Sequence, residues 1–148
     1  MAMDGSTDPL AMVQRLLDAT NAHDIDSLVS CFSDDYVNET PVHPARGFHG
    51  TEQVRRNWTQ LFDGIPNLRA SLLARATNGD TAWTEWEISG VRRDGAVHIM
   101  RGVIVFGVTH GKAQWAKFYL EQVDQSGGDV NDAVARASGP RPPSSAAR

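Results

Sequence analysis

The chain has 148 residues, of which 41% are hydrophobic and 22% are charged, and its formal net charge at pH 7 is −4. This length allows one domain with its own core, and the composition is that of an ordinary globular protein. A net acidic chain lacks the positive charge that nucleic-acid binding requires, and no apolar run approaches the roughly 20 residues that span a bilayer. We therefore expect neither nucleic acid nor a membrane as a partner.

The start of the sequence, MAMDGSTDPL, has neither the basic nor the apolar region of a secretory signal, and Cys31 is the only cysteine. These features predict a cytoplasmic protein without an intrachain disulfide. His43 and His49 lie six residues apart on a loop that contains two prolines, which is not the spacing of a metal site. We expect no metal and no cofactor.

Three helices are predicted in the first half of the chain. Asp8 and Pro9 have the pattern of an N-cap and a first helical residue, and apolar residues recur at helical spacing from Leu10 to Thr20. Asp24 can cap a second, short helix. A third helix begins at Gly50-Thr51 and ends at Gly64, with one apolar stripe formed by Val54, Trp58, Leu61 and Phe62.

The second half of the chain has strand periodicity, with candidates at about 68–77, 81–90, 96–108 and 113–123. The turns NGD, RDG and THGK separate them and predict an antiparallel meander. Helices followed by a curved sheet indicate an α+β fold in which about three helices and the sheet enclose a cone with an open, pocket-forming end. We expect a flexible N-terminus at 1–8, one domain at 9–124 and a mostly disordered tail at 125–148, with a weak helical turn at 129–138.

Alternation along the strands separates a concave from a convex sheet face. The concave set is nearly all apolar and consists of Thr84, Trp86, Ile88, His98, Met100, Gly102, Ile104, Phe106, Ala116, Phe118 and Leu120. The convex set mixes aromatic and charged residues, and its predicted dimer interface consists of Trp83, Glu85, Glu87, Arg101, Val103, Trp115, Lys117 and Tyr119. One alternative is a monomer whose C-terminal segment covers this face. Another is a register shifted by one residue, which would turn Glu85, Glu87 and Glu121 inward.

Three segments carry a resemblance to a known superfamily: VQRLLDATNAHDIDSLVSCFSDDYV at 13–37, GFHGTEQVRRNW at 47–58 and GKAQWAKFYLEQVD at 111–124. Together they resemble the NTF2-like superfamily, in particular its SnoaL-like branch, over about residues 9–124. That group includes polyketide cyclases, ketosteroid isomerases and limonene-epoxide hydrolases. The resemblance implies a cone-shaped α+β barrel of the NTF2-like, cystatin-like type, and it is weak for activity because this fold has many functions.

The resemblance also places the catalytic residues of two relatives on this chain. The general-base aspartate, the oxyanion tyrosine and the second oxyanion donor of ketosteroid isomerases match Thr40, Leu16 and a position near Ile104. The Arg and the two Asp residues of the epoxide hydrolases match Trp86, Ile88 and a position near Leu120. None of these side chains can perform the matching step. We therefore expect neither isomerase nor epoxide hydrolase activity.

The leading functional hypothesis is a SnoaL-like protein that binds a small apolar molecule and acts, if it is an enzyme, on a cyclic or carbonyl substrate without a cofactor. The alternatives are a ligand carrier or sensor, and a dimeric interaction module whose cavity its own side chains fill. An open cavity with a polar cluster favours the first. His43 is the best candidate for acid–base chemistry. The predicted pocket consists of Asn38, Thr40, His43, Trp58, Phe62, Thr84, Trp86, Ile88, His98, Met100, Ile104 and Phe118.

Overall fold

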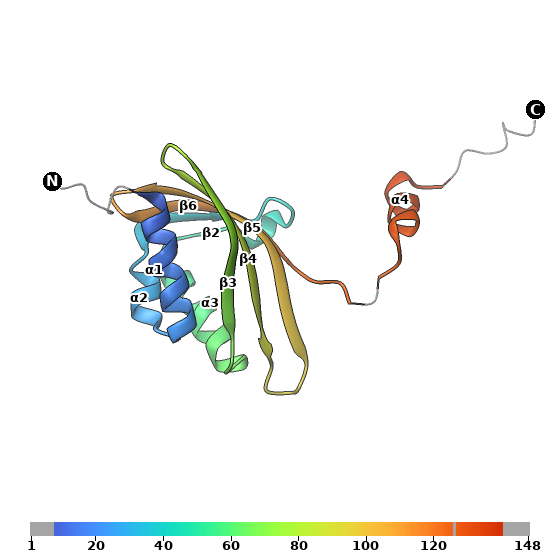
Figure 1. Ribbon diagram of the computed structural model, residues 1–148, viewed down its shortest axis with the longest axis horizontal. Coiled ribbons are helices and arrows are strands. Elements are labelled where there is room, and N and C mark those ends of the chain that lie inside the picture. The colour runs from blue at the N-terminus through green and yellow to red at the C-terminus, as the bar shows by residue number, and fades with distance from the viewer. Residues whose placement is uncertain (1–7, 126, 141–148) are drawn as a thin grey trace, which may run out of the picture.

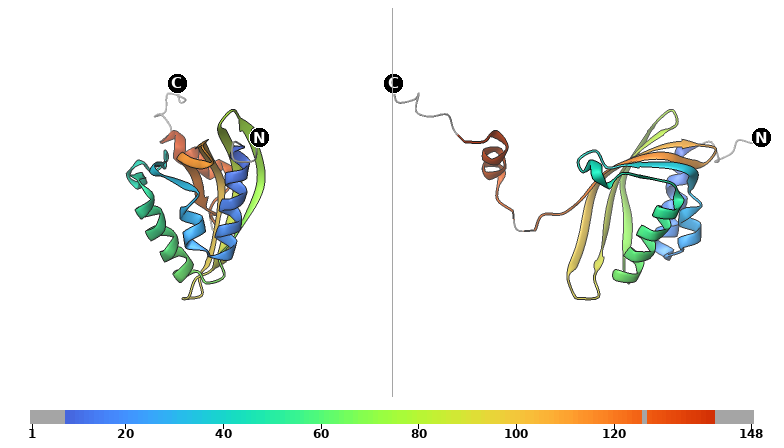
Figure 2. Two further views of the ribbon diagram at one scale, coloured as in Figure 1. Left: turned by 90° about the vertical axis from the view of Figure 1, so that its left-hand side faces the viewer. Right: turned by 180° about the vertical axis from the view of Figure 1, so that it is seen from behind.

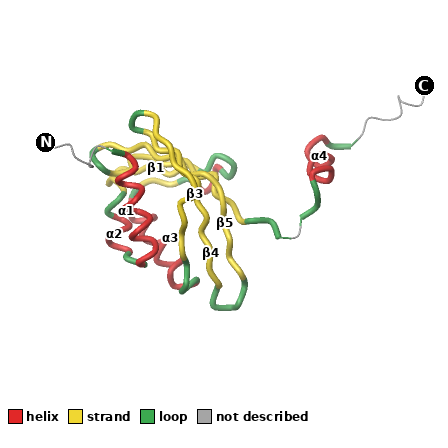
Figure 3. The backbone as a smooth tube through the Cα atoms, in the orientation of Figure 1, coloured by secondary structure: helices red, strands yellow, loops and turns green. Residues whose placement is uncertain are grey.

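The computed structural model describes residues 8–125 and 127–140. Three helices lie on one face of a single curved sheet (Figure 1, Figure 2): α1 (Pro9–Ala22), α2 (Ile25–Val29) and α3 (Thr51–Gly64). The strands bend around these helices (Figure 3) and follow the spatial order β2 (Phe48–His49), β1 (Phe32–Glu39), β6 (Lys112–Gln122), β5 (Val97–Thr109), β4 (Thr81–Val91), β3 (Arg69–Asn78). A short 3₁₀ turn, η2 (Pro44–Arg46), lies between β1 and β2. The predicted α+β fold is confirmed.

The sheet is not purely antiparallel. β3 to β6 form the predicted meander, but β1 lies parallel to β6, with Asn38 opposite Ala116 and Glu39 opposite Lys117. Strand periodicity does not reveal the whole of β1, because Asp34 and Asp35 within it are both polar and exposed. The parallel pair brings β1 beside the concave face of the meander, and thereby places its side chains near those of the sheet.

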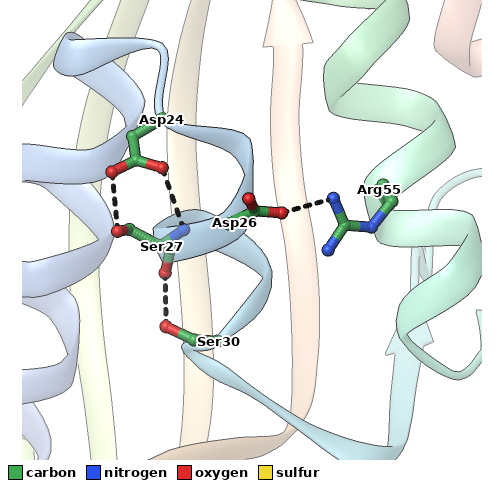
Figure 4. A network of polar contacts seen from close by, with 5 residues as sticks. All are labelled: Asp24, Asp26, Ser27, Ser30 and Arg55. Atoms are coloured by element: carbon green, nitrogen blue, oxygen red, sulfur yellow. Dashed lines mark hydrogen bonds and ion pairs between the residues drawn. The ribbon is translucent and has the colours of Figure 1, made fainter.

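The helix starts follow the predicted capping chemistry. The Asp8 carboxylate accepts a hydrogen bond from the Leu10 amide at 2.9 Å. Asp24 caps α2 by accepting from the Ser27 amide at 3.2 Å and from its hydroxyl at 2.7 Å, as Figure 4 shows. An Nη1 atom of Arg55 lies 2.8 Å from an oxygen of Asp26, which ties α3 to α2.

The register places the apolar set on the concave face as predicted. Thr84 pairs with Ile104, and Ile104 pairs with Phe118. Trp86 is 2% exposed, whereas its neighbour Trp83 is 50% exposed. A register shifted by one residue would exchange these environments, so the structure rules out that alternative.

The chain after β6 contains a helix, α4 (Val130–Ser138), where the sequence predicts only a weak turn in a mostly disordered tail. Asp129 and Asp132 form a reciprocal capping box at its start, which accounts for the added order. Every residue of α4 is exposed, and the helix lies away from the other three helices (Figure 1). Residues 1–7 of the predicted flexible N-terminus and residues 141–148 of the tail lie outside the described residues.

Candidate functional site

A cavity of about 250 Å³ lies between α3 and the concave face of the sheet, at the end where β1 and β6 finish. Seven of the residues predicted for the pocket line it: Asn38, Thr40, Trp58, Ile88, His98, Met100 and Phe118. The same cavity is also lined by Phe32, Tyr36, Arg46, Phe48, Val54, Asn57, Leu61, Leu68 and Leu120. Its wall is therefore mainly aromatic and aliphatic, with a small number of polar groups, as is usual for small-molecule sites.

Tyr36 and Asn38 form a buried polar pair on β1. The Tyr36 hydroxyl donates a hydrogen bond of 2.8 Å to Oδ1 of Asn38. Burial raises the pKa of Tyr36, which keeps the phenol protonated as a donor. The amide nitrogen of Asn38 has no hydrogen-bond partner among the described residues. Asn38 therefore keeps a donor for a ligand that enters the cavity.

His98 begins the inward-facing set of β5 and is 9% exposed. Its Nδ1 atom lies 3.3 Å from the amide nitrogen of Gln122, which can only donate. The neutral imidazole therefore carries its proton on Nε2. Burial, and secondarily the charge of Arg92, lowers the pKa of His98 and favours this neutral form. In this form His98 is a hydrogen-bond donor to the cavity.

Several predicted pocket residues lie elsewhere. Trp86 and Ile104 line a second space of about 20 Å³ behind the cavity. The indole N–H of Trp86 donates to the Thr84 hydroxyl at 2.7 Å, so Thr84 belongs to the core. Phe62 stacks on His23, with ring centroids 4.3 Å apart, and lines neither space.

His43 is not among the residues that line the cavity, and its Nε2 atom lies 3.1 Å from Oε1 of Glu121 at the end of β6. The imidazole thus pairs with a carboxylate that does not line the cavity either. A catalytic role for His43 stays a prediction.

Some lining residues that were not predicted had a signal in the sequence. Tyr36 alternates with Asn38 along β1 and with Thr40 just after the strand, and Leu61 belongs to the apolar stripe of α3. No sequence signal marks Arg46 or Asn57 as a cavity residue, because an arginine in a loop and a polar residue inside a helix are both common on any protein surface.

Within residues 8–125 and 127–140, no group of three or more His, Cys, Asp or Glu side chains is placed to hold a metal ion. In the same part of the chain, no helix combines the length and apolar character that a membrane span requires.

The SnoaL-like domain family model matches residues 13–116. Solved structures give the same fold. A cystatin-fold protein from Novosphingobium aromaticivorans is 23% identical over 74% of this chain and 96% of its own, with a TM-score of 0.65. A Mycobacterium tuberculosis protein in complex with estradiol-17beta-hemisuccinate is 19% identical over 75% of this chain and 92% of its own, also with a TM-score of 0.65. An LEH-like epoxide hydrolase from M. tuberculosis is 16% identical over 80% of this chain and 86% of its own, with a TM-score of 0.68. Comparison with curated proteins gives no match.

Proposed function

This chain belongs to the SnoaL-like domain family, and we propose that it binds a small cyclic molecule with a carbonyl group in the cavity beneath α3. One observation carries the proposal: an apolar wall surrounds two hydrogen-bond donors, the Asn38 amide and the Nε2–H of His98. Donors in a mainly apolar site fix the orientation of a ligand acceptor such as a carbonyl oxygen. The family fold is known for small-molecule binding, which supports this assignment.

The dimensions and the wall restrict the ligand. Trp58, Met100 and Phe118 provide flat and polarizable surfaces, which suit a planar ring system. A cavity of about 250 Å³ lies just below the usual range of roughly 300–1,000 Å³ for drug-sized ligands. A compact ligand of two or three rings is therefore favoured. The M. tuberculosis neighbour in complex with estradiol-17beta-hemisuccinate supports a cyclic ligand for this fold.

If the protein is an enzyme, its reaction differs from those of the isomerases and epoxide hydrolases. The positions matched to their catalytic groups are Leu16, Thr40, Trp86, Ile88, Ile104 and Leu120, all without an ionisable side chain. The donors at Asn38 and His98 would polarise a carbonyl and stabilise negative charge that develops on its oxygen. We propose cofactor-free chemistry of this kind. A carrier or sensor role is the alternative, and it requires the same binding event without turnover.

We also propose a homodimer that forms through the convex face. Trp83 is 50% exposed and Tyr119 is 40% exposed, and both border a surface hollow of about 240 Å³ that also includes Trp115 and Lys117. A cluster of exposed aromatic side chains of this kind favours a protein interface.

The proposed location is the cytoplasm, and the buried free thiol of Cys31 is compatible with a reducing compartment.

Calorimetric titration with 2-acetylnaphthalene, a two-ring ketone, tests the binding proposal. The wild-type protein is expected to bind it, and Met100→Trp, which places a larger side chain in the cavity, is expected to weaken binding by about tenfold or more. Met100→Leu is the matched control, because it keeps the volume and should keep the affinity. A wild-type protein that shows no binding heat, or equal affinity in the Met100→Trp variant, would contradict the proposal.

A further inference from the structure

The polar lining of the cavity has an unusual charge balance for an acidic chain. The protein carries 18 acidic and 14 basic residues, Lys and Arg together. Yet no aspartate or glutamate lines the cavity in the part of the chain that the structure describes, and Arg46 is its single permanently charged residue. His98 is neutral at pH 7, as described above. The permanent charge carried by the lining residues is therefore positive, opposite in sign to that of the whole chain.

Hydrogen-bond donors also outnumber acceptors in this lining. The Asn38 oxygen already accepts from Tyr36, and Oδ1 of Asn57 already accepts from Gln53 at 2.7 Å. What remains for a ligand is mostly N–H: the amides of these two asparagines, the Nε2–H of His98 and the guanidinium of Arg46. A ligand that covers these donors must bring acceptor oxygens for them, because a donor that becomes buried without an acceptor is costly.

Arg46 is held at the rim of the cavity by a well-anchored turn. Its amide donates to the His43 carbonyl at 2.9 Å, and the Gly47 amide donates to the Pro44 carbonyl at 3.2 Å. The His43–Glu121 contact holds the start of this turn against β6.

The C-terminal end of the turn also lies close against the sheet. A Cβ atom at Gly47 would lie only 3.1 Å from the Asn38 carbonyl oxygen, and the next residue, Phe48, pairs with Asn38 across β1 and β2. The Arg46 side chain itself is exposed and has no hydrogen bond or ion pair with any described residue. The turn is thus fixed while its guanidinium remains available.

We infer that the ligand of this cavity is a compact apolar carboxylic acid whose carboxylate binds Arg46 at the rim while its rings lie among Trp58, Met100 and Phe118. This inference rests on the proposed function and narrows its ligand class. A planar guanidinium matches a carboxylate in two parallel N–H···O hydrogen bonds, which makes a carboxylate a better partner than a single hydroxyl or ketone oxygen. The apolar wall supplies the affinity for the rings, and Arg46 selects the charged group.

The test compares 2-naphthylacetic acid with its uncharged amide, 2-naphthylacetamide, by calorimetric titration of the full-length chain at low salt. The wild-type protein should bind the acid about tenfold more tightly than the amide, and this preference should shrink as NaCl is added because exposed charge pairs are screened. Arg46→Gln should abolish the preference without weakening binding of the amide. Arg46→Lys, which keeps the charge but not the planar fork, should retain part of it.

Arg75→Gln is the matched control, because Arg75 lies exposed on β3, outside the cavity, and its loss changes net charge by the same amount. An acid preference that survives Arg46→Gln, or that falls equally in Arg75→Gln, overturns the inference. So does equal binding of acid and amide to the wild-type protein. Titration with 2-acetylnaphthalene separates the two proposals: if the ketone binds while the acid preference is absent, only the carboxylate inference fails. If none of the three probes binds, both fail.

Discussion

The side chain of His98 has different environments in the folded and unfolded chains. In the folded protein it is 9% exposed, accepts a hydrogen bond on Nδ1 and lies within the electrostatic influence of Arg92. Burial, and then the positive charge, lowers its pKa below the value of 6.5 that it has in an open chain. Folding therefore opposes protonation of this imidazole.

The sign of the resulting pH dependence follows from proton linkage. Below about pH 6.5 the unfolded chain binds a proton at His98, whereas the folded chain binds it only at a lower pH. The free energy of unfolding therefore decreases as the pH falls below about 6.5. His98→Gln removes the titration. Urea unfolding at pH 7 and pH 5 should show the wild-type protein losing more stability than the variant. Equal losses would show that His98 titrates alike in both states.

Gly102 lets β5 and β6 approach each other closely. Its φ is 151°, and an added Cβ would lie 2.1 Å from the Tyr119 carbonyl oxygen and 2.9 Å from the Leu120 Cα. Both contacts are with backbone atoms of the partner strand, which cannot move aside as the end of a side chain can. Any other residue must therefore push the two strands apart at a pair that lies beside the cavity.

Gly102→Ala is expected to lower the free energy of unfolding by about 1–3 kcal/mol or more, because it combines overpacking with an unfavourable backbone angle. Gly64→Ala is the control, since a Cβ at that position meets nothing within 4 Å at the end of α3. Urea unfolding should leave the control close to wild type. Equal stability of the two variants would mean that β6 can shift at no cost.

The helices and strands that the sequence predicted are those that depend on local chemistry. The helix caps at Asp8 and Asp24 and the alternation along β4 depend on residues close in the chain, and these predictions are confirmed. The parallel pairing of β1 with β6 joins residues far apart in sequence, and no local pattern specifies it.

The candidate site was predicted only in part for the same reason. Strand alternation identified His98 and Met100, and the apolar stripe of α3 identified Trp58, as cavity residues. The path of the loop after β1 decides that Arg46 lines the cavity and that His43 meets Glu121 instead. That path depends on packing against β6 and β2, which periodicity does not encode.

At the scale of the whole molecule, helices α1 to α3 cover one face of the sheet, and no helix among the described residues covers the other (Figure 2). On the uncovered face, Arg101 and Glu87 neutralise each other at 2.7 Å, and the Lys117 ammonium lies 5.8 Å from the centre of the Trp115 ring. Charges paired in this way lower the electrostatic cost of bringing two copies together. The described part of the tail does not cover this face, because α4 is exposed along its whole length.

Light scattering at micromolar concentration should therefore give twice the chain mass of 16.1 kDa, both for the full chain and for a variant that ends at Gln125. Combining Trp83→Lys with Tyr119→Lys should give a monomer, because it places two new charges in the hollow of the proposed interface. Val97→Lys replaces an apolar residue that is 63% exposed outside the hollow, and should remain dimeric. A monomeric full chain with a dimeric truncated chain would instead show that the C-terminal segment covers the convex face and competes with a second copy for it.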